Sequence, residues 1–138
     1  MYNYSEFWDN LSFVKSDELE NYNQYFLNEN RSSTIFPVFK KHNTKVRLEF
    51  LTYWIIKHMN NVVIRFISRT GDGFQLKKEY KAIHKFHAFT YNVSKIFSNL
   101  NNGFCGSIEV EVFSKKKPVF NYPAISLFYY SSNSSSVV

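Results

Sequence analysis

The sequence predicts a mainly β fold: an antiparallel β-sandwich with a short N-terminal α-helix. Aromatic residues make up 20% of the 138 residues, a share that suits pleated, half-buried sheets. Short runs of alternating apolar and polar residues recur between residues 45 and 130 and are separated by turn-forming residues, which is typical of antiparallel sheets. Helical spacing of apolar side chains is confined to residues 1–30.

Residues 1–30 are predicted to be a helical segment packed on the body, and residues 31–138 to be the β-sandwich domain. Ser16 is a good N-cap, and acids follow it where a helix dipole favours them, so a helix is expected over about residues 17–28. Its apolar stripe consists of Leu19, Tyr22, Phe26 and, at the margin, Tyr25. A further helical turn is expected upstream, with a shared face made by Phe7, Trp8 and Leu11.

Residues 30–44 are expected to be a connection, because residues 30–33 are turn-like and Pro37 blocks a helix. Gly71 and Gly73 flank Asp72 and predict a hairpin, since such residues tolerate positive φ. The expected strands cover residues 46–56, 62–69, 74–80, 87–93, 107–113 and 124–130. The Ser-rich tail after them is interpreted as a linker that leads to a further strand.

The lysines 115–117 and two prolines interrupt the last two expected strands. Lysine at such a place discourages edge-to-edge pairing, so the triplet is interpreted first as a solubilising loop. Pro118 and Pro123 lack the N–H that a central ladder needs. The final strand is therefore expected either to be an edge or to join its sheet only after Ala124.

Charge is distributed unevenly. The whole chain has a formal net charge of +6, but residues 1–30 carry −5 and residues 31–138 carry +11. A basic body favours anionic partners, although a solvated surface is the simpler interpretation. The candidates for binding an anion are Arg65, Arg69, Lys115, Lys116 and Lys117. The candidates for stacking on a sugar are Tyr53, Trp54, Tyr122, Tyr129 and Tyr130, with core packing as the favoured interpretation of each ring.

The sequence contains none of the common nucleotide-binding or hydrolase motifs. Glu109 and Glu111 lie on one outward strand face about 7 Å apart, a spacing compatible with a glycosidase pair, but outward acids on an amphipathic strand usually serve solubility. His84 and His87 would point to opposite faces of a strand. We therefore expect no enzymatic activity, no cofactor and no metal. Cys105, the lone cysteine, excludes an internal disulfide and is expected to be a small buried side chain.

One stretch of the chain resembles a known family. An Asn-led strand, 61–66, runs to an acidic turn at Asp72; His87 precedes the next strand; Ser114 and Pro118 follow a later one. This layout resembles small bacterial β-sandwich accessory proteins such as the sensory rhodopsin transducer family, over roughly half of the chain. The N-terminal helix, the 46–56 strand and the lysine triplet differ from that family. The resemblance implies a sandwich and an oligomeric binding or signalling adaptor, and it assigns no site residues.

The expected function is that of a non-catalytic binding or adaptor module that engages a protein partner or a carbohydrate, with homo-oligomer formation left open. The alternative is nucleic-acid or anionic-glycan binding through the basic sheet surface, by the charge described above. The first twenty residues lack the features of a signal peptide, and no apolar run reaches the length of a membrane span. A cytoplasmic location is therefore expected.

Overall fold

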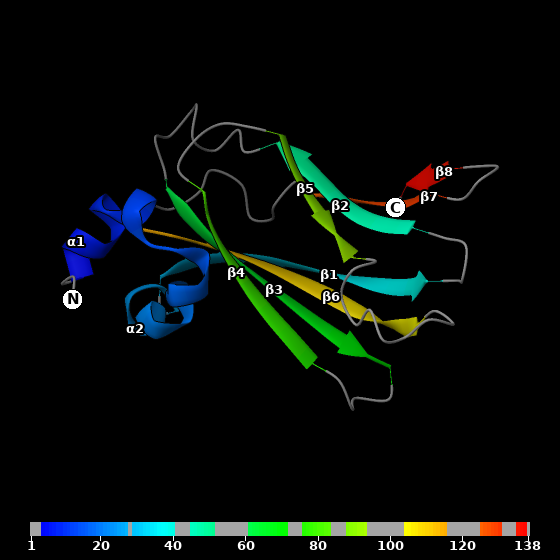
Figure 1. The fold of residues 1–138 in the computed structure, drawn as a ribbon, viewed down its shortest axis with the longest axis horizontal. Coiled ribbons are helices and arrows are strands. Elements are labelled where there is room, and N and C mark those ends of the chain that lie inside the picture. The colour runs from blue at the N-terminus through cyan, green and yellow to red at the C-terminus, as the bar shows by residue number, and fades with distance from the viewer. Residues whose placement is uncertain are drawn as a thin grey trace.

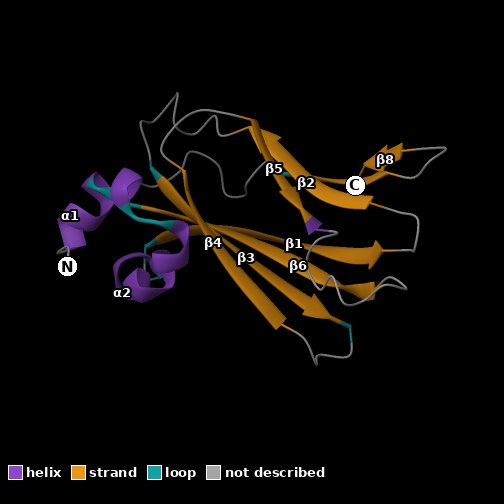
Figure 2. Ribbon diagram, viewed as in Figure 1, coloured by secondary structure: helices purple, strands orange, loops and turns teal. Residues whose placement is uncertain are grey.

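Two four-stranded antiparallel sheets and an N-terminal layer of short helices make up the fold in the computed structural model (Figures 1 and 2). Sheet A has the strand order β1-β6-β3-β4, and sheet B has the order β5-β2-β7-β8. The predicted fold class, a mainly β sandwich with a short N-terminal helix, is confirmed. The structure describes residues 4–27, 29–40, 45–51, 61–71, 76–83, 88–93, 104–115, 125–130 and 135–137.

The elements follow one another in three groups. The helical layer contains two α-helices and two 3-10 helices: α1 (Tyr4–Asp9), η1 (Leu11–Phe13), η2 (Ser16–Tyr22) and α2 (Asn23–Phe26). The strands of sheet A are β1 (Asn30–Lys40), β6 (Phe104–Ser114), β3 (Val62–Thr70) and β4 (Leu76–Ile83). The strands of sheet B are β5 (Ala88–Asn92), β2 (Lys45–Leu51), β7 (Ser126–Tyr130) and β8 (Ser135–Val137).

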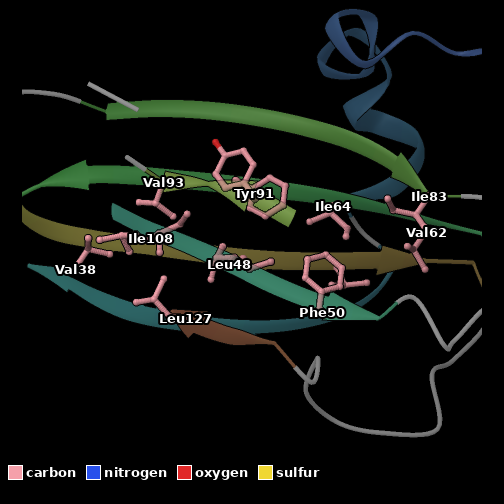
Figure 3. Packing of buried hydrophobic residues seen from close by; sticks show 14 residues of the cluster. Val38, Leu48, Phe50, Val62, Ile64, Ile83, Tyr91, Val93, Ile108 and Leu127 are labelled. Carbon is pink, nitrogen blue, oxygen red and sulfur yellow. The ribbon is translucent and has the colours of Figure 1, made fainter. Parts of the chain in front are cut away.

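The main hydrophobic core lies between the two sheets (Figure 3). Alternation along β2 and β7 sends Leu48, Phe50 and Leu127 of sheet B toward Ile64 and Ile108 of sheet A, and all five side chains are buried. Burial of one such side chain contributes about 1.5–3 kcal/mol. The alternation predicted for residues 46–50, 62–66 and 108–112 is confirmed.

Aromatic rings join the sheets near β5. The ring of Phe66 on β3 stacks on Tyr91 of β5 with 4.0 Å between centroids and on Phe89 of β5 with 6.0 Å between centroids. Offset or stacked pairs of this kind add about 0.5–1.5 kcal/mol beyond the burial of their area. These contacts hold the short strand β5 against the centre of sheet A.

A second core lies on the outer face of sheet A, under the helical layer. The ring of Phe26 packs against Phe113 of β6 and Tyr80 of β4, with centroids 5.4 and 6.1 Å apart. Strand β3 is therefore buried on both faces at this end, since Val63 contributes to the second core. The predicted apolar stripes are confirmed, because the helical layer buries Phe7, Trp8, Leu11, Leu19 and Phe26 and partly buries Tyr22 and Tyr25.

Two predictions about local structure need correction. The helix expected over 17–28 is a 3-10 helix from Ser16 to Tyr22, and only Asn23–Phe26 is α-helical. The 3-10 winding places residues three apart on one face, which suits Leu19 and Tyr22. The connection expected at residues 30–44 is in fact an eleven-residue strand over its first part, β1, paired along its length with β6. Pro37 is tolerated there because β1 is an edge strand of sheet A.

The C-terminal part follows one of the two expected alternatives. Strand β7 begins at Ser126, after Ala124 as expected, but it is not an edge, because β2 and β8 pair with its two sides. The tail, interpreted as a linker that leads to a further strand, itself contains the short strand β8 at residues 135–137. None of the helices in the described part of the chain is long and apolar enough to span a membrane.

Gly71 follows the last residue of β3 and lies close to the backbone of β6. Its N–H donates a hydrogen bond to the backbone oxygen of Cys105 at 2.6 Å, and a Cβ at position 71 would lie only 2.9 Å from that oxygen. Strands β3 and β4 pair antiparallel on either side of residues 71–75, as the predicted hairpin requires. The described part of this turn therefore needs glycine for space beside a neighbouring backbone.

Gly71→Ala is expected to destabilise the fold by about 1–3 kcal/mol, because either β6 or the end of β3 must move to admit the methyl group. The free energy of unfolding in urea measures this loss. Lys78→Ala, an exposed change on neighbouring β4, is the control and is expected to stay within about 0.5 kcal/mol of the original chain. Equal stability of the Gly71→Ala protein would contradict the close approach.

Candidate functional site

A groove runs along the outer face of sheet B. Figure 1 shows sheet B on the side of the molecule away from the helical layer. The register of the sheet builds the groove: Glu49 of β2 lies opposite Thr90 of β5 on one side and opposite Ser126 of β7 on the other. The groove has a volume of about 540 Å³. It is lined by Glu49, Phe50, Leu51, Ala88, Phe89, Thr90, Ser126 and Phe128.

A polar network orders one end of this face. The guanidinium of Arg47 lies 4.2 Å from the centroid of Tyr130, and its Nη2 donates to the Tyr130 hydroxyl at 2.7 Å. That hydroxyl donates in turn to Oε1 of Glu49 at 3.4 Å, and Nε of Arg47 lies 2.6 Å from the same oxygen. The hydrogen bond with Tyr130, together with the charge of Glu49, raises the pKa of Arg47 despite partial desolvation. Glu49 is thus held in one orientation at the edge of the groove.

The groove combines apolar walls with a few polar groups. Phe128 and the half-exposed Leu51 present carbon surface, and the Phe128 ring lies 6.0 Å from Tyr130 at 20° between planes. Glu49 offers acceptor oxygens, while the hydroxyls of Thr90 and Ser126 both donate and accept. Binding sites for small molecules commonly have this composition, in which apolar walls provide area and a few polar groups fix orientation.

A second hollow opens on the other side of β5. It has a volume of about 400 Å³ and lies between the inner face of β4 and strand β5, where Phe89 and Thr90 line both hollows. The carboxylate of Glu79 stands in it, 2.9 Å from Nζ of Lys77. Burial would raise the pKa of Glu79, but hydrogen bonds from Lys77 and Tyr91 and the charges of two lysines lower it overall. Burial and the Glu79 carboxylate raise the pKa of the Tyr91 phenol.

Glu111 corrects the expectation of a solvated acidic pair. It is 2% exposed, and its two oxygens lie 2.5 Å from Nε of Arg31 and 2.7 Å from Nη2 of Arg65. Desolvation lowers the pKa of Arg65, but its hydrogen bonds to Glu111 and Tyr80 outweigh this and raise it. The carboxylate is buried because Arg31 and Arg65, from the two flanking strands, close over it. The ring of Phe113 shields Arg65, whose guanidinium carbon lies 5.4 Å from the ring centroid.

The predicted anion-binding residues that the structure describes lie apart. Arg65 is paired with Glu111, while Arg69 lies opposite Ser107 toward the far end of the same face. Lys115 follows the other end of β6, eight residues beyond Ser107, which corresponds to about 26 Å along a strand. The remaining candidates, Lys116, Lys117, Tyr53, Trp54 and Tyr122, lie outside the described residues, so they stay predictions, as do His84 and His87.

The two remaining tyrosine candidates differ. Tyr129 packs on the main core and its hydroxyl donates to the backbone oxygen of Pro37 at 3.3 Å, as core packing would predict. Tyr130 faces outward with Arg47. Cys105 is exposed rather than buried, because its side of β6 reaches beyond the helical layer. Within the described residues, no group of three or more His, Cys, Asp or Glu side chains is placed to hold a metal ion.

The residues of the groove were not among the sequence candidates. The alternation of residues 45–51 does place Arg47 and Glu49 on one outward face. Nothing local to the sequence shows, however, that β5 and β7 flank β2, and this pairing is what brings Thr90 and Phe128 to the same surface.

Comparisons of the chain with protein-family models, with curated proteins and with solved structures give no match. The resemblance to the sensory rhodopsin transducer family therefore stays a prediction.

Glu111→Gln is expected to lower the free energy of unfolding by about 3 kcal/mol, because two arginines lose their counter-charge. This value is at the lower end of the loss in stability expected when a buried ion pair is broken, because the Arg31 side chain remains partly in water. Urea unfolding followed by tryptophan fluorescence measures the loss. Glu109→Gln, a half-exposed change on the same strand face, serves as the matched control, and equal losses for both variants would rule out a special role for the buried cluster.

The lowered pKa of Glu79 predicts a pH dependence. The folded state favours the Glu79 carboxylate, so the unfolded state takes up a proton first as the pH falls. The stabilisation from Glu79 is therefore present above the reference pKa of 4.5, and it is lost as the pH falls through the lower pKa of the folded state. Glu79→Gln removes this effect. The difference in unfolding free energy between the two proteins is expected to be largest at pH 7 and to shrink as the pH falls below 4.5. A difference that does not change between pH 7 and pH 3 would contradict the assignment.

Proposed function

We propose that the protein is a non-catalytic binding module that holds a carbohydrate in the groove on the outer face of sheet B. The observation that carries the proposal is the groove itself, where the carbon surface of Phe128 and Leu51 lies beside Glu49, Thr90 and Ser126. A sugar has apolar patches of C–H groups surrounded by hydroxyls that both donate and accept. The groove supplies a partner for each of these features.

The charge of this face favours an uncharged or weakly charged sugar. Arg47 lies on the same outward face of sheet B, opposite Phe128, and its charge is balanced by Glu49 at 2.6 Å. A polyanion would require several uncompensated basic side chains along one surface. Among the described candidates, Arg65 is balanced by Glu111, and Arg69 and Lys115 lie at opposite ends of sheet A. The described charges thus favour a neutral sugar. Binding of nucleic acid or of an anionic glycan is the alternative function, and a protein partner is another.

Phe128→Ala is expected to weaken glycan binding at least tenfold, because the sugar loses the ring on which it packs. A glycan array identifies the ligand, and calorimetric titration with that glycan measures the affinity. Thr90→Val, which removes a hydroxyl on an exposed site without changing size, is expected to weaken binding by a smaller factor. Phe13→Ala in the helical layer is the control and is expected to bind normally.

Two outcomes would overturn this proposal. The first is an array without any bound glycan. The second is glycan binding that the Phe128→Ala and Thr90→Val variants retain in full. Binding to DNA or RNA that falls steeply between low and physiological salt would instead support the alternative, because release of counterions governs such complexes.

A further inference from the structure

The two hollows beside β5 are neighbours. The groove on the outer face of sheet B and the second hollow, between β4 and β5, share Phe89 and Thr90 as lining residues. The consecutive residues 89–92 all line the second hollow, so it borders the edge of β5 and not only one of its faces. A ligand that lies across the groove and extends past Thr90 therefore enters the second hollow.

The second hollow lies where the edges of the two sheets separate. The strand order makes β4 an edge of sheet A and β5 an edge of sheet B. At the opposite edge of sheet A the sheets are bridged, because the Tyr129 hydroxyl of β7 donates to the backbone oxygen of Pro37 on β1 at 3.3 Å. Between β4 and β5 there is instead a hollow of about 400 Å³. The described residues thus leave space for a ligand on the β4–β5 side of the sandwich.

Glu79 provides an oriented acceptor in the second hollow. Lys77, Glu79 and Lys81 alternate along β4, so they share its inner face, and all three line the hollow. Nζ of Lys77 lies 2.9 Å from Oε1 of Glu79, and the Tyr91 hydroxyl of β5 donates to the same carboxylate. Donors from two strands thus fix the orientation of Glu79. Because a carboxylate has about four acceptor sites, it can still accept hydrogen bonds from the hydroxyls of a ligand.

Lys81 provides donors in the same hollow. It is half-exposed, and its charge helps to lower the pKa of Glu79. In the described part of the chain, no carboxylate forms an ion pair with the Lys81 ammonium, which only donates. The hollow therefore offers acceptors at Glu79 and donors at Lys81 beside the carbon surface of the Phe89 ring. This is the combination that a sugar needs, since its hydroxyls donate and accept around patches of C–H groups.

The path across both hollows is longer than a single sugar ring. From β7 over β2 to β5 the groove spans two strand spacings, or about 10 Å. Beyond β5 the second hollow extends to β4 of the facing sheet, and packed sheets lie about 10 Å apart. A path of about 20 Å accommodates several linked sugar units. Each hollow also has the volume of an ordinary site for a small ligand.

We propose that the second hollow is a subsite for a further sugar unit, so that the ligand is a neutral oligosaccharide that crosses β5 at Thr90; this rests on the carbohydrate binding proposed above. One unit packs against Phe128 in the groove. A further unit lies beside Phe89 in the second hollow, where its hydroxyls donate to Glu79 and accept from Lys81. The length of the ligand, and not only its first sugar, then determines the affinity.

Titration with ligands of increasing length tests the second subsite. The probes are linear neutral oligosaccharides of one to four units, built from glucose, mannose, galactose or N-acetylglucosamine, and calorimetry measures each dissociation constant. In a series that binds, the tetrasaccharide is expected to bind about tenfold or more tightly than the single sugar. The gain comes from hydrogen bonds to the charged groups of Glu79 and Lys81, which only the longer chain reaches.

Two lysines of β4 provide a matched pair of variants. Lys81→Ala is expected to reduce the ratio of tetrasaccharide to monosaccharide affinity by about fivefold, because the further unit loses its donor. Lys78 shares the outer face of β4 with Tyr80, so Lys78→Ala is expected to keep the original ratio. Phe128→Ala is expected to weaken the binding of both ligands, since both occupy the groove. Circular dichroism confirms that each variant is folded.

Amide chemical shifts locate the ligand independently of the variants. The single sugar is expected to shift the amides of residues 88–90, whereas the tetrasaccharide is expected to shift those of residues 77–81 of β4 as well. Affinity that does not change with length, a gain that Lys81→Ala keeps in full, or unshifted β4 amides would overturn the second subsite and leave binding in the groove intact. Probes that fail to bind at every length would instead overturn the proposed function, and the subsite with it.

Discussion

The antiparallel pairing of β3 with β6 is the constraint on which the rest of the structure depends. It places Arg65 opposite Glu111 on the outer face of sheet A and Phe66 opposite Val110 on the inner face. Because side chains alternate with a period of two, a shift of one residue would turn Arg65 into the hydrophobic core and Phe66 toward the helical layer. The buried ion cluster thus opposes a register slip, since a buried charge without its partner costs several kcal/mol.

The helical layer divides the outer face of sheet A into two environments. Under the helices, Phe113 and Tyr80 are buried and Glu111 is enclosed by two arginines. Beyond them, Phe39 and Cys105 on the same face are exposed. The difference does not come from the strands, whose alternation is continuous, but from the described helices, which pack over only one end of the eleven-residue strand β6.

Local patterns predicted the strands whose alternation is clean. Residues 62–69 and 107–113 alternate as expected, and their inward sides are buried. Strand β1 was missed because Pro37 and the polar residues 30–33 carry the signals of a connection, and only its place at the edge of sheet A makes them compatible with a strand. The predictions of burial for Glu111 and Cys105 were wrong for the same kind of reason. Both side chains lie on the outward face of β6, and segments distant in the sequence decide that Glu111 is covered and that Cys105 is exposed.

The groove on sheet B was beyond local prediction for a related reason. Arg47 and Glu49 alternate with apolar residues as on any amphipathic strand, and only pairing with β5 and β7, from about 40 and 80 residues further along the chain, adds Thr90, Ser126 and Phe128. Local alternation is visible within a window of a few residues, whereas neighbour order in an antiparallel sheet is set by the whole chain. Site residues supplied by different strands are therefore the part of such a fold that a single sequence reveals least.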